Sequence, residues 1–202
     1  MAYKPRTIAE LRQQGYQATT VKEELRRNLI QKIKAREDIF PGIVGYGDTV
    51  TPKVENAILS GQDMIFLGER GQAKSRLLRS LVVLLDKEIP VIAGCEINDN
   101  PYAPACKACR SRVAERGDAT EIAWLPRERR YGEKLATPDI TMADLIGEVD
   151  PIKVAEGRYL ADELTIHYGL IPRTNRGIFA INELPDLPER IHGRGIPVEV
   201  NG

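Results

Sequence analysis

The sequence has little that would place it in a membrane, in a secretory pathway or on a nucleic acid. It contains no run of about 18 apolar residues, which a membrane-spanning helix requires. Its first residues, MAYKPRTIAELRQQ, lack the apolar stretch of a secretory signal. Lysine plus arginine total 29 and so do aspartate plus glutamate, which leaves no net basic field for nucleic acid. We therefore expect a cytoplasmic protein that binds no membrane, and nucleic-acid binding has no support.

Cysteine is also scarce. The chain has three cysteines, of which Cys106 and Cys109 form a C-x-x-C with Cys95 upstream, and an odd number does not suit a secreted disulfide framework. Three thiolates would hold Zn²⁺ if His167 or His192 supplied a fourth ligand, but the second C-x-x-C of a strong zinc motif is missing. We expect three reduced thiols with little or no bound zinc, although the sequence leaves zinc binding open.

The hydrophobic residues suffice for one main domain preceded by helices. The 202 residues are 42% hydrophobic, enough for a single sizeable core. Residues 1–36 are predicted to form an N-terminal helical segment of two helices, because the S/T-x-x-E spacing of a capping box occurs twice. The proline and glycines of 40–45 then interrupt the helical pattern, so we place the main domain at 37–202. The capping-box pairs are Thr7 with Glu10 and Thr20 with Glu23.

Three short apolar runs, at 63–67, 89–94 and 177–182, are typical of buried strands. Near-continuous apolar strands that alternate with helices predict a parallel sheet covered on both faces. Residues 95–176, between the second and third runs, are polar and too long for an ordinary loop. The predicted fold class is therefore α/β, with a parallel sheet flanked by helices and one long insertion.

A phosphate-binding motif follows the first run. Residues 68–75 read GERGQAKS, which matches G-x-x-x-x-G-K-[ST] except that Ala73 replaces the second glycine. Backbone N–H groups of such a loop cradle phosphate oxygens, Lys74 reaches the β- and γ-phosphates and Ser75 ligates Mg²⁺. The alanine matters only if its position needs a positive φ or space beside the phosphate. The predicted ATP-binding residues are Gly68, Glu69, Arg70, Gly71, Gln72, Ala73, Lys74, Ser75 and Arg76.

The third run ends in two polar residues, Asn182 and Glu183, at the sheet edge where ligands bind in open α/β folds. Together they are similar to the second nucleotide motif, in which four apolar residues precede Asp-Glu. Asn182 lacks the aspartate's charge but keeps an oxygen that accepts hydrogen bonds from a metal-bound water. Glu183 is predicted to act as the general base that orients the attacking water. Asn182 and Glu183 are thus the predicted catalytic residues, with Ser75 and Asn182 at the magnesium.

Three blocks in the same order carry a family resemblance: Ile43-Val44-Gly45, GERGQAKS at 68–75 and NRGIFAINEL at 175–184. They resemble the magnesium chelatase I-subunit branch of AAA+ ATPases over about residues 37–190. That branch carries an insertion in its second helix, which would explain the long polar segment. The resemblance implies a P-loop NTPase (AAA+) fold, ATP and Mg²⁺ as cofactors, and ATP hydrolysis coupled to remodelling of a partner. It also implies a homo-oligomeric ring and a partner with a metal-dependent adhesion-type domain.

The resemblance is incomplete after Ile191. The branch continues with a helix, a hairpin, a sensor strand, an arginine finger and a helical lid, and the remaining residues are too few for them. We therefore expect the lid subdomain to be absent and this chain to be weakly active or inactive. The segment PVEV at 197–200 is expected either to pair with the third strand in place of the sensor strand or to leave that edge exposed.

Two alternatives to an ATPase stay open. The first is a nucleotide-binding or nucleotide-sensing module that does not hydrolyse ATP, which Asn182 favours. The second is a fragment of a DNA-associated AAA+ motor, for which the only support is a basic segment near Trp124 and Tyr131. Acidic residues interrupt this segment, so we predict a solvated loop there. Its basic residues are Arg127, Arg129, Arg130 and Lys134.

Overall fold

The computed structural model describes residues 4–69, 71–155, 163–184 and 200–201. The chain has a mixed α/β structure that divides into two compact units, each assembled from three stretches of sequence. No helix within the described ranges is long and apolar enough to cross a membrane. Unit 1 comprises Met1–Ala18, Glu88–Pro126 and Thr141–Arg176, and unit 2 comprises Thr19–Lys87, Arg127–Ile140 and Gly177–Gly202.

Unit 2 begins with a helix whose start the sequence specifies. The hydroxyl of Thr20 accepts a hydrogen bond from the backbone N–H of Glu23, whose carboxylate accepts one from the Thr20 backbone N–H. This reciprocal capping box starts α2 (Val21–Ala35) and confirms the helix predicted there. Among its described residues unit 2 also contains α3 (Thr51–Leu59), α4 (Lys74–Ser80) and the 3₁₀ turns η1 (Leu81–Leu84) and η3 (Arg127–Arg129).

These helices pack with the sheet around one apolar core. Leu29 of α2, Ile58 of α3 and Leu78 of α4 are all buried in it, as are Ile178 and Ala180 of the sheet. Each fully buried leucine contributes about 1.5–3 kcal/mol of transfer free energy. The core therefore fixes α4, which carries the lysine and serine of the phosphate motif, relative to the strand that carries Asn182.

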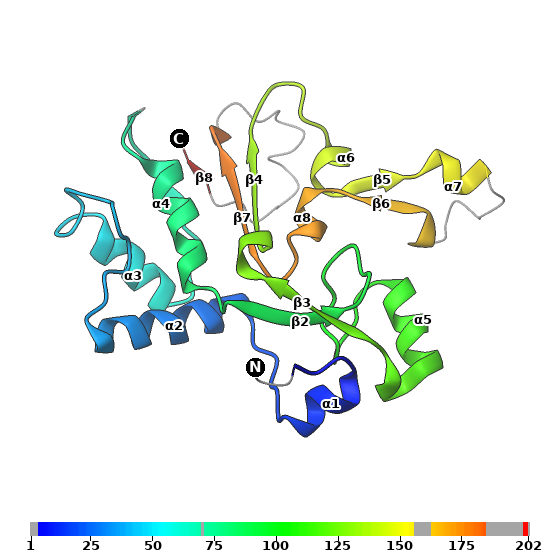
Figure 1. Cartoon of the computed structure of the whole chain (residues 1–202). Coiled ribbons are helices and arrows are strands. Elements are labelled where there is room, and N and C mark those ends of the chain that lie inside the picture. Colours follow the sequence, from blue (N-terminus) through cyan, green and yellow to red (C-terminus); the bar gives the residue numbers. More distant parts are fainter. Residues whose placement is uncertain (1–3, 70, 156–162, 185–199, 202) are drawn as a thin grey trace. The chain divides into compact units, whose positions relative to one another are not determined.

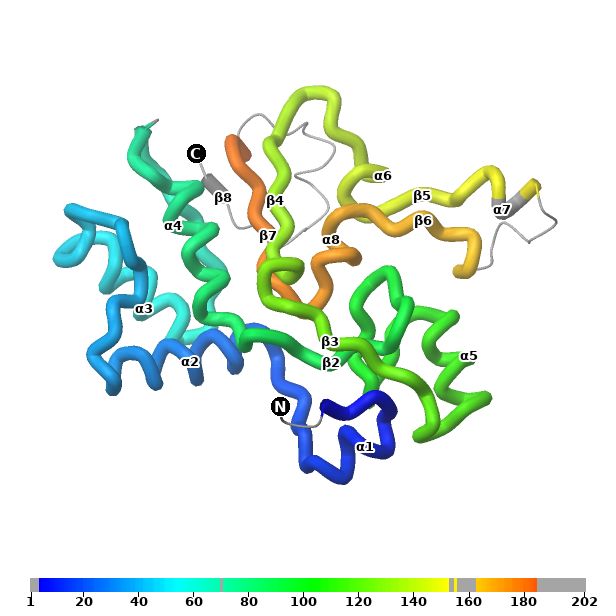
Figure 2. Tube along the Cα trace, in the orientation of Figure 1, coloured from blue at the N-terminus to red at the C-terminus, as the bar shows by residue number. Residues whose placement is uncertain are grey.

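Over the described ranges, the sheet of unit 2 has four strands in the order β1-β8-β7-β4, and every pairing between neighbours is parallel. The first and third apolar runs form β1 and β7, as predicted. Figure 2 shows β4 lying beside β7 although the two strands are far apart in the sequence. The strands are β1 (Ile65–Phe66), β4 (Tyr131–Leu135), β7 (Ile178–Asn182) and β8 (Val200–Asn201).

The short strand β8 lies between β1 and β7. Val200 pairs with Ile65 on one side and with Ile181 on the other. One residue of the PVEV segment therefore takes the place beside the third strand that was expected for it, while 197–199 lie outside the described residues. Along the described part of this sheet, β7 has a hydrogen-bonded neighbour on both edges.

A buried ion pair ties α2 to the start of β4. The guanidinium of Arg130 donates to both carboxylate oxygens of Glu24 at 2.7 and 2.6 Å, and both side chains are almost fully buried. The backbone carbonyl of Arg130 accepts from the N–H of Ile178, the first residue of β7. The prediction of a solvated loop is therefore wrong at Arg130, because a buried acid from α2 neutralises its charge.

Unit 1 contains the second apolar run, which forms β2 but not in the predicted parallel sheet. β2 (Glu88–Ile92) pairs antiparallel with β3 (Ile122–Pro126), a strand within the segment that the sequence indicated as a polar insertion (Figure 1). Its buried residues Ile89 and Val91 pack with Leu125 of β3. The expectation that all three runs share one sheet is thus wrong, because β2 pairs with β3 within unit 1 instead.

Short elements make up the rest of unit 1. Trp124 lies in β3 and its indole N–H donates to the Pro5 carbonyl at 3.0 Å, so this side chain too is not part of a solvated loop. Strands β5 and β6 form an antiparallel pair of their own. The elements are α1 (Ile8–Gln13), α5 (Lys107–Arg116), η2 (Gly117–Ala119), α6 (Met142–Leu145), β5 (Gly147–Val149), α7 (Pro151–Ala155), η4 (Glu163–Thr165), β6 (Ile166–Tyr168) and α8 (Leu170–Arg173).

Candidate nucleotide site

The predicted phosphate motif forms the connection between β1 and α4. Gly71 has φ +84° and Ala73, directly before α4, has φ 56° and ψ 21°. Ala73 stands where the consensus has its second glycine, and this position does have a positive φ. A residue with a side chain is less stable in that backbone conformation by about 1–2 kcal/mol. The Tyr46 hydroxyl donates to the Gln72 carbonyl at 2.6 Å and holds the loop from outside. Arg70 lies outside the described residues.

Lys74 turns its side chain back over this loop. Its ammonium donates to the carbonyl oxygens of Gly68 at 2.8 Å and Glu69 at 2.7 Å. The positive charge is thus held against the loop by uncharged acceptors. Phosphate oxygens would be stronger acceptors, because they carry a negative charge that pairs with the ammonium.

The serine of the motif contacts the end of β7. The Ser75 hydroxyl donates to the Asn182 side-chain oxygen at 3.4 Å, and the two residues are 107 positions apart in the sequence. The structure therefore brings together the two residues that were predicted to lie at the magnesium. This contact joins the first motif to the second within unit 2.

A carboxylate that the sequence did not indicate lies next to Asn182. The Asn182 amide nitrogen donates to Glu133 of β4, which also accepts from the Arg79 guanidinium at 2.7 and 2.9 Å and from the Tyr131 hydroxyl at 3.2 Å. The hydrogen bonds from Arg79 are the main reason that the pKa of Glu133 is lowered, while partial burial opposes them. Glu133 is therefore ionised at neutral pH.

Sequence reasoning missed Glu133 because its strand is polar. The residues of β4, YGEKL, lack the apolar run by which the other sheet strands were recognised. The parallel register of β4 on β7 brings Glu133 into reach, and register between distant strands is not encoded in a local pattern. The one usable signal was the presence of acidic residues within a segment that otherwise looked basic.

Glu183 directly follows β7 and is half buried. Its φ is +56°, a conformation that is uncommon for a residue other than glycine. Such strain costs about 1–3 kcal/mol and is concentrated at functional sites. Of the remaining predicted residues, Gln72 has its side chain against Gly68, and the Arg76 guanidinium lies beside Gly42.

Comparison with known proteins supports the fold. No protein-family model matches the chain, and no curated protein matches it. It is similar to a solved structure described as the complex between subunits BchI and BchD of magnesium chelatase, built from a single-particle cryo-EM reconstruction, with a TM-score of 0.50 and 24% sequence identity. The match covers 76% of this chain but 43% of that one, so this chain spans less than half of the neighbour's length. The similarity indicates a relationship in fold to magnesium chelatase.

Proposed function

We propose that unit 2 binds Mg-ATP between the loop at 68–75 and the end of β7, and that it hydrolyses ATP to remodel a partner protein. The observation that carries the proposal is the hydrogen bond from Ser75 to Asn182, because it joins the two motifs that grip phosphate and metal in P-loop proteins. The similarity in fold to magnesium chelatase supports the same assignment.

The side chains at this edge of the sheet suit Mg²⁺. The Ser75 hydroxyl, the Asn182 amide oxygen and the Glu133 carboxylate are linked by hydrogen bonds, and oxygen is the ligand atom that Mg²⁺ prefers. Ser75 would hold the ion directly, and Asn182 would accept a hydrogen bond from one of its waters. When bound with ATP, the ion would neutralise charge on the phosphates.

Glu133 offers the negative charge that Asn182 lacks. The second motif usually places an aspartate where this chain has Asn182, and a neutral amide attracts a divalent cation less strongly. The ionised Glu133 lies one hydrogen bond away. We infer that Glu133 acts through Asn182 as a positioning residue, fixing the amide so that its oxygen faces Ser75 and the metal.

Lys74 and Glu183 complete the proposed site. The Lys74 ammonium exchanges the Gly68 and Glu69 carbonyls for the β- and γ-phosphates when nucleotide binds. Glu183, at the end of β7, accepts a hydrogen bond from the attacking water and orients it toward the γ-phosphorus.

The proposed assembly is an oligomer that contacts a second protein. The neighbour's structure is described as a complex of two different subunits, and the sequence resemblance implies a ring. In such a ring an arginine from an adjacent, different subunit would stabilise the transition state, an effect worth roughly 10³–10⁵ in rate. The alternative is a nucleotide-binding module without turnover, which the neutral Asn182 favours.

The test is calorimetric titration of the full chain with Mg-ATP. We expect measurable binding that Lys74→Ala abolishes, since the charge that neutralises the phosphates is lost. Lys34→Ala is the matched control, because Lys34 is an exposed lysine of α2 in the same unit. Equal affinity of the wild type and the Lys74 variant would refute the site. Binding without hydrolysis, with or without a partner, would establish the alternative.

A further inference from the structure

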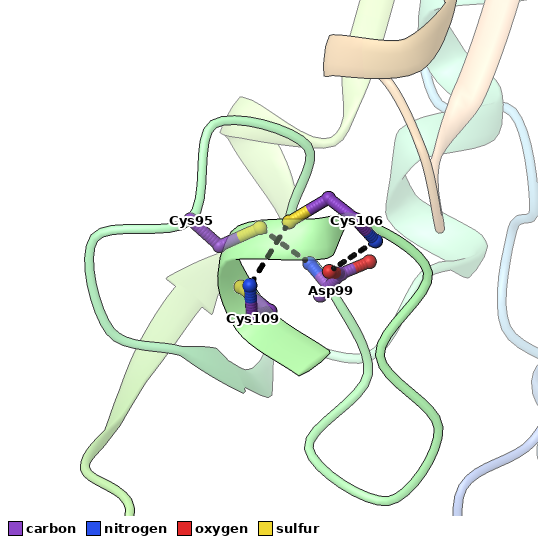
Figure 3. A group of neighbouring side chains, drawn as sticks. All are labelled: Cys95, Asp99, Cys106 and Cys109. Atoms are coloured by element: carbon purple, nitrogen blue, oxygen red, sulfur yellow. Dashed lines mark hydrogen bonds between the residues drawn. The ribbon is translucent and has the colours of Figure 1, made fainter. Parts of the chain in front are cut away.

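Three cysteines and one aspartate meet in unit 1. Cys95 follows β2, Asp99 lies in the same connection, Cys106 caps the N-terminus of α5 and Cys109 lies in its first turn (Figure 3). One ligand atom from each lies within 4.8 Å of all the others. In a tetrahedral zinc site with Zn–S bonds of about 2.3 Å, the sulfurs lie about 3.8 Å apart. The sulfurs would need to move together by at most about 1 Å to surround a single ion.

Asp99 is a carboxylate buried without a cation. Asp99 is fully buried. Its two carboxylate oxygens accept hydrogen bonds from the backbone N–H groups of Ala105 and Cys106, each at 3.0 Å. Within the described part of the chain no lysine or arginine forms an ion pair with it. A buried charge is costly unless an opposite charge compensates it. A metal ion among the sulfurs would supply that charge, and the two N–H bonds would aim the carboxylate at it.

The backbone also points donors at two of the sulfurs. The Asp99 N–H donates to the Cys95 sulfur at 3.3 Å, and the Cys109 N–H donates to the Cys106 sulfur at 3.4 Å (Figure 3). The thiolate is the form that binds a metal. These two N–H groups are placed to donate to the sulfurs of Cys95 and Cys106 when they carry a negative charge.

Without a metal the buried thiols are protonated. Burial is the main reason that the pKa of Cys106 is raised to about 11 and that the pKa of Cys109 is raised as well. A bound divalent cation reverses this preference, because a coordinating thiol is deprotonated outright. Metal binding would therefore release the thiol protons to solvent, and no sulfur would change its oxidation state.

The cluster is accessible to an ion and lies beside positive charge. A pocket lined by all three cysteines also has Lys107, Arg112 and Glu163 on its wall. Three thiolates and a carboxylate around one divalent ion leave a net charge of −2. Lys107 and Arg112 offset part of this charge.

We propose that Cys95, Asp99, Cys106 and Cys109 bind one Zn²⁺ in a closed structural site. A set of three soft sulfurs and one oxygen favours zinc over Mg²⁺ or Ca²⁺. With four protein ligands no position is left for a substrate, so the ion clamps the connection at 93–106 onto α5. This replaces the expectation of three zinc-free thiols, which considered only His167 and His192 as fourth ligands.

The test begins with metal analysis of the full chain purified in reductant without added metal. We expect about one zinc per chain. After the zinc is removed with a chelator, Co²⁺ should produce sulfur-to-cobalt charge-transfer bands, and added Zn²⁺ should bleach them. A chain with under a tenth of an equivalent of zinc and no such bands would overturn the proposal. A chain mass that is lower than that of the reduced chain by two hydrogens, together with thiols that resist alkylation, would also overturn the proposal, since it would show a disulfide.

Variants assign the ligands. Cys109→Ser should lose stoichiometric zinc, and Asp99→Asn should weaken zinc binding at least tenfold in competition with a chromogenic chelator, because an anionic ligand becomes neutral. Asp118→Asn is the control, since Asp118 is an exposed carboxylate of unit 1 that pairs with Arg12. If Cys109→Ser fails to fold, the wild-type cobalt spectrum and Asp99→Asn decide the question. Equal zinc affinity of the Asp99 and Asp118 variants would refute the four-ligand site.

Discussion

The ion pair between Glu24 and Arg130 allows a quantitative test of how unit 2 is held together. The two side chains are only 3% and 1% exposed, and Glu24 also accepts from the Asp86 backbone N–H at 2.6 Å. Arg130→Met would leave the Glu24 carboxylate buried with that one N–H bond. Breaking a buried pair by removing one partner costs about 3–5 kcal/mol. The ratio of unfolded to folded unit 2 should therefore rise by about a hundredfold to several thousandfold.

Urea unfolding followed by circular dichroism measures this change as a shift in midpoint at constant slope. The exposed pair Lys22–Asp63, with both side chains 55% exposed, is the control, and Lys22→Met should cost less than about 1 kcal/mol. The double variant Glu24→Leu with Arg130→Met should recover much of the loss, because no uncompensated charge remains. A cost below about 1 kcal/mol for Arg130→Met alone would refute the reasoning.

Three further predictions concern the nucleotide site. Glu183→Gln should retain Mg-ATP but stop hydrolysis, because an amide cannot accept the proton of the attacking water; unchanged steady-state phosphate release would assign the base elsewhere. Glu133→Gln should lower stability at pH 7, and this loss should disappear as pH falls through the lowered pKa that Glu133 has in the folded state. The stability that the carboxylate contributes is fully present above its unfolded pKa of about 4.3 and is lost below its folded pKa. A difference in unfolding midpoint that is independent of pH would contradict this. Ala73→Gly should be tolerated and Ala73→Val should weaken nucleotide binding, because a β-branched residue resists the positive φ at this position; equal affinities of the two variants would show that the loop adapts.

The local patterns of the sequence predicted local structure well. The capping box at Thr20 and Glu23 starts α2, the apolar runs at 63–67 and 177–182 contain β1 and β7, and Lys74 begins the helix after the loop. Each depends on residues close together in the chain. The contact between Ser75 and Asn182 is a long-range one. It was predictable because the two nucleotide motifs of P-loop proteins meet at the bound metal.

Features that depend on distant residues were not predictable in this way. Nothing near Glu133 indicates that β4 pairs with β7, and nothing near Arg130 indicates that Glu24 neutralises it. Asp99 was missed because it belongs to no cysteine motif, yet the fold of the connection between β2 and α5 places it among the sulfurs. In each case a polar residue gained its role from a long-range contact that periodicity does not report.

Hydrogen–deuterium exchange with and without Mg-ADP tests the nucleotide site most directly, because it reports where the ligand binds. Backbone amides of the loop at 68–75 and of Asn182 and Glu183 should become protected, since phosphates accept hydrogen bonds from the loop and Mg²⁺ orders the end of β7. Peptides from α1 and α5 in unit 1 should not change, and Lys74→Ala should remove the protection. Protection that is confined to other segments, or that persists in the Lys74 variant, would contradict the proposed nucleotide site.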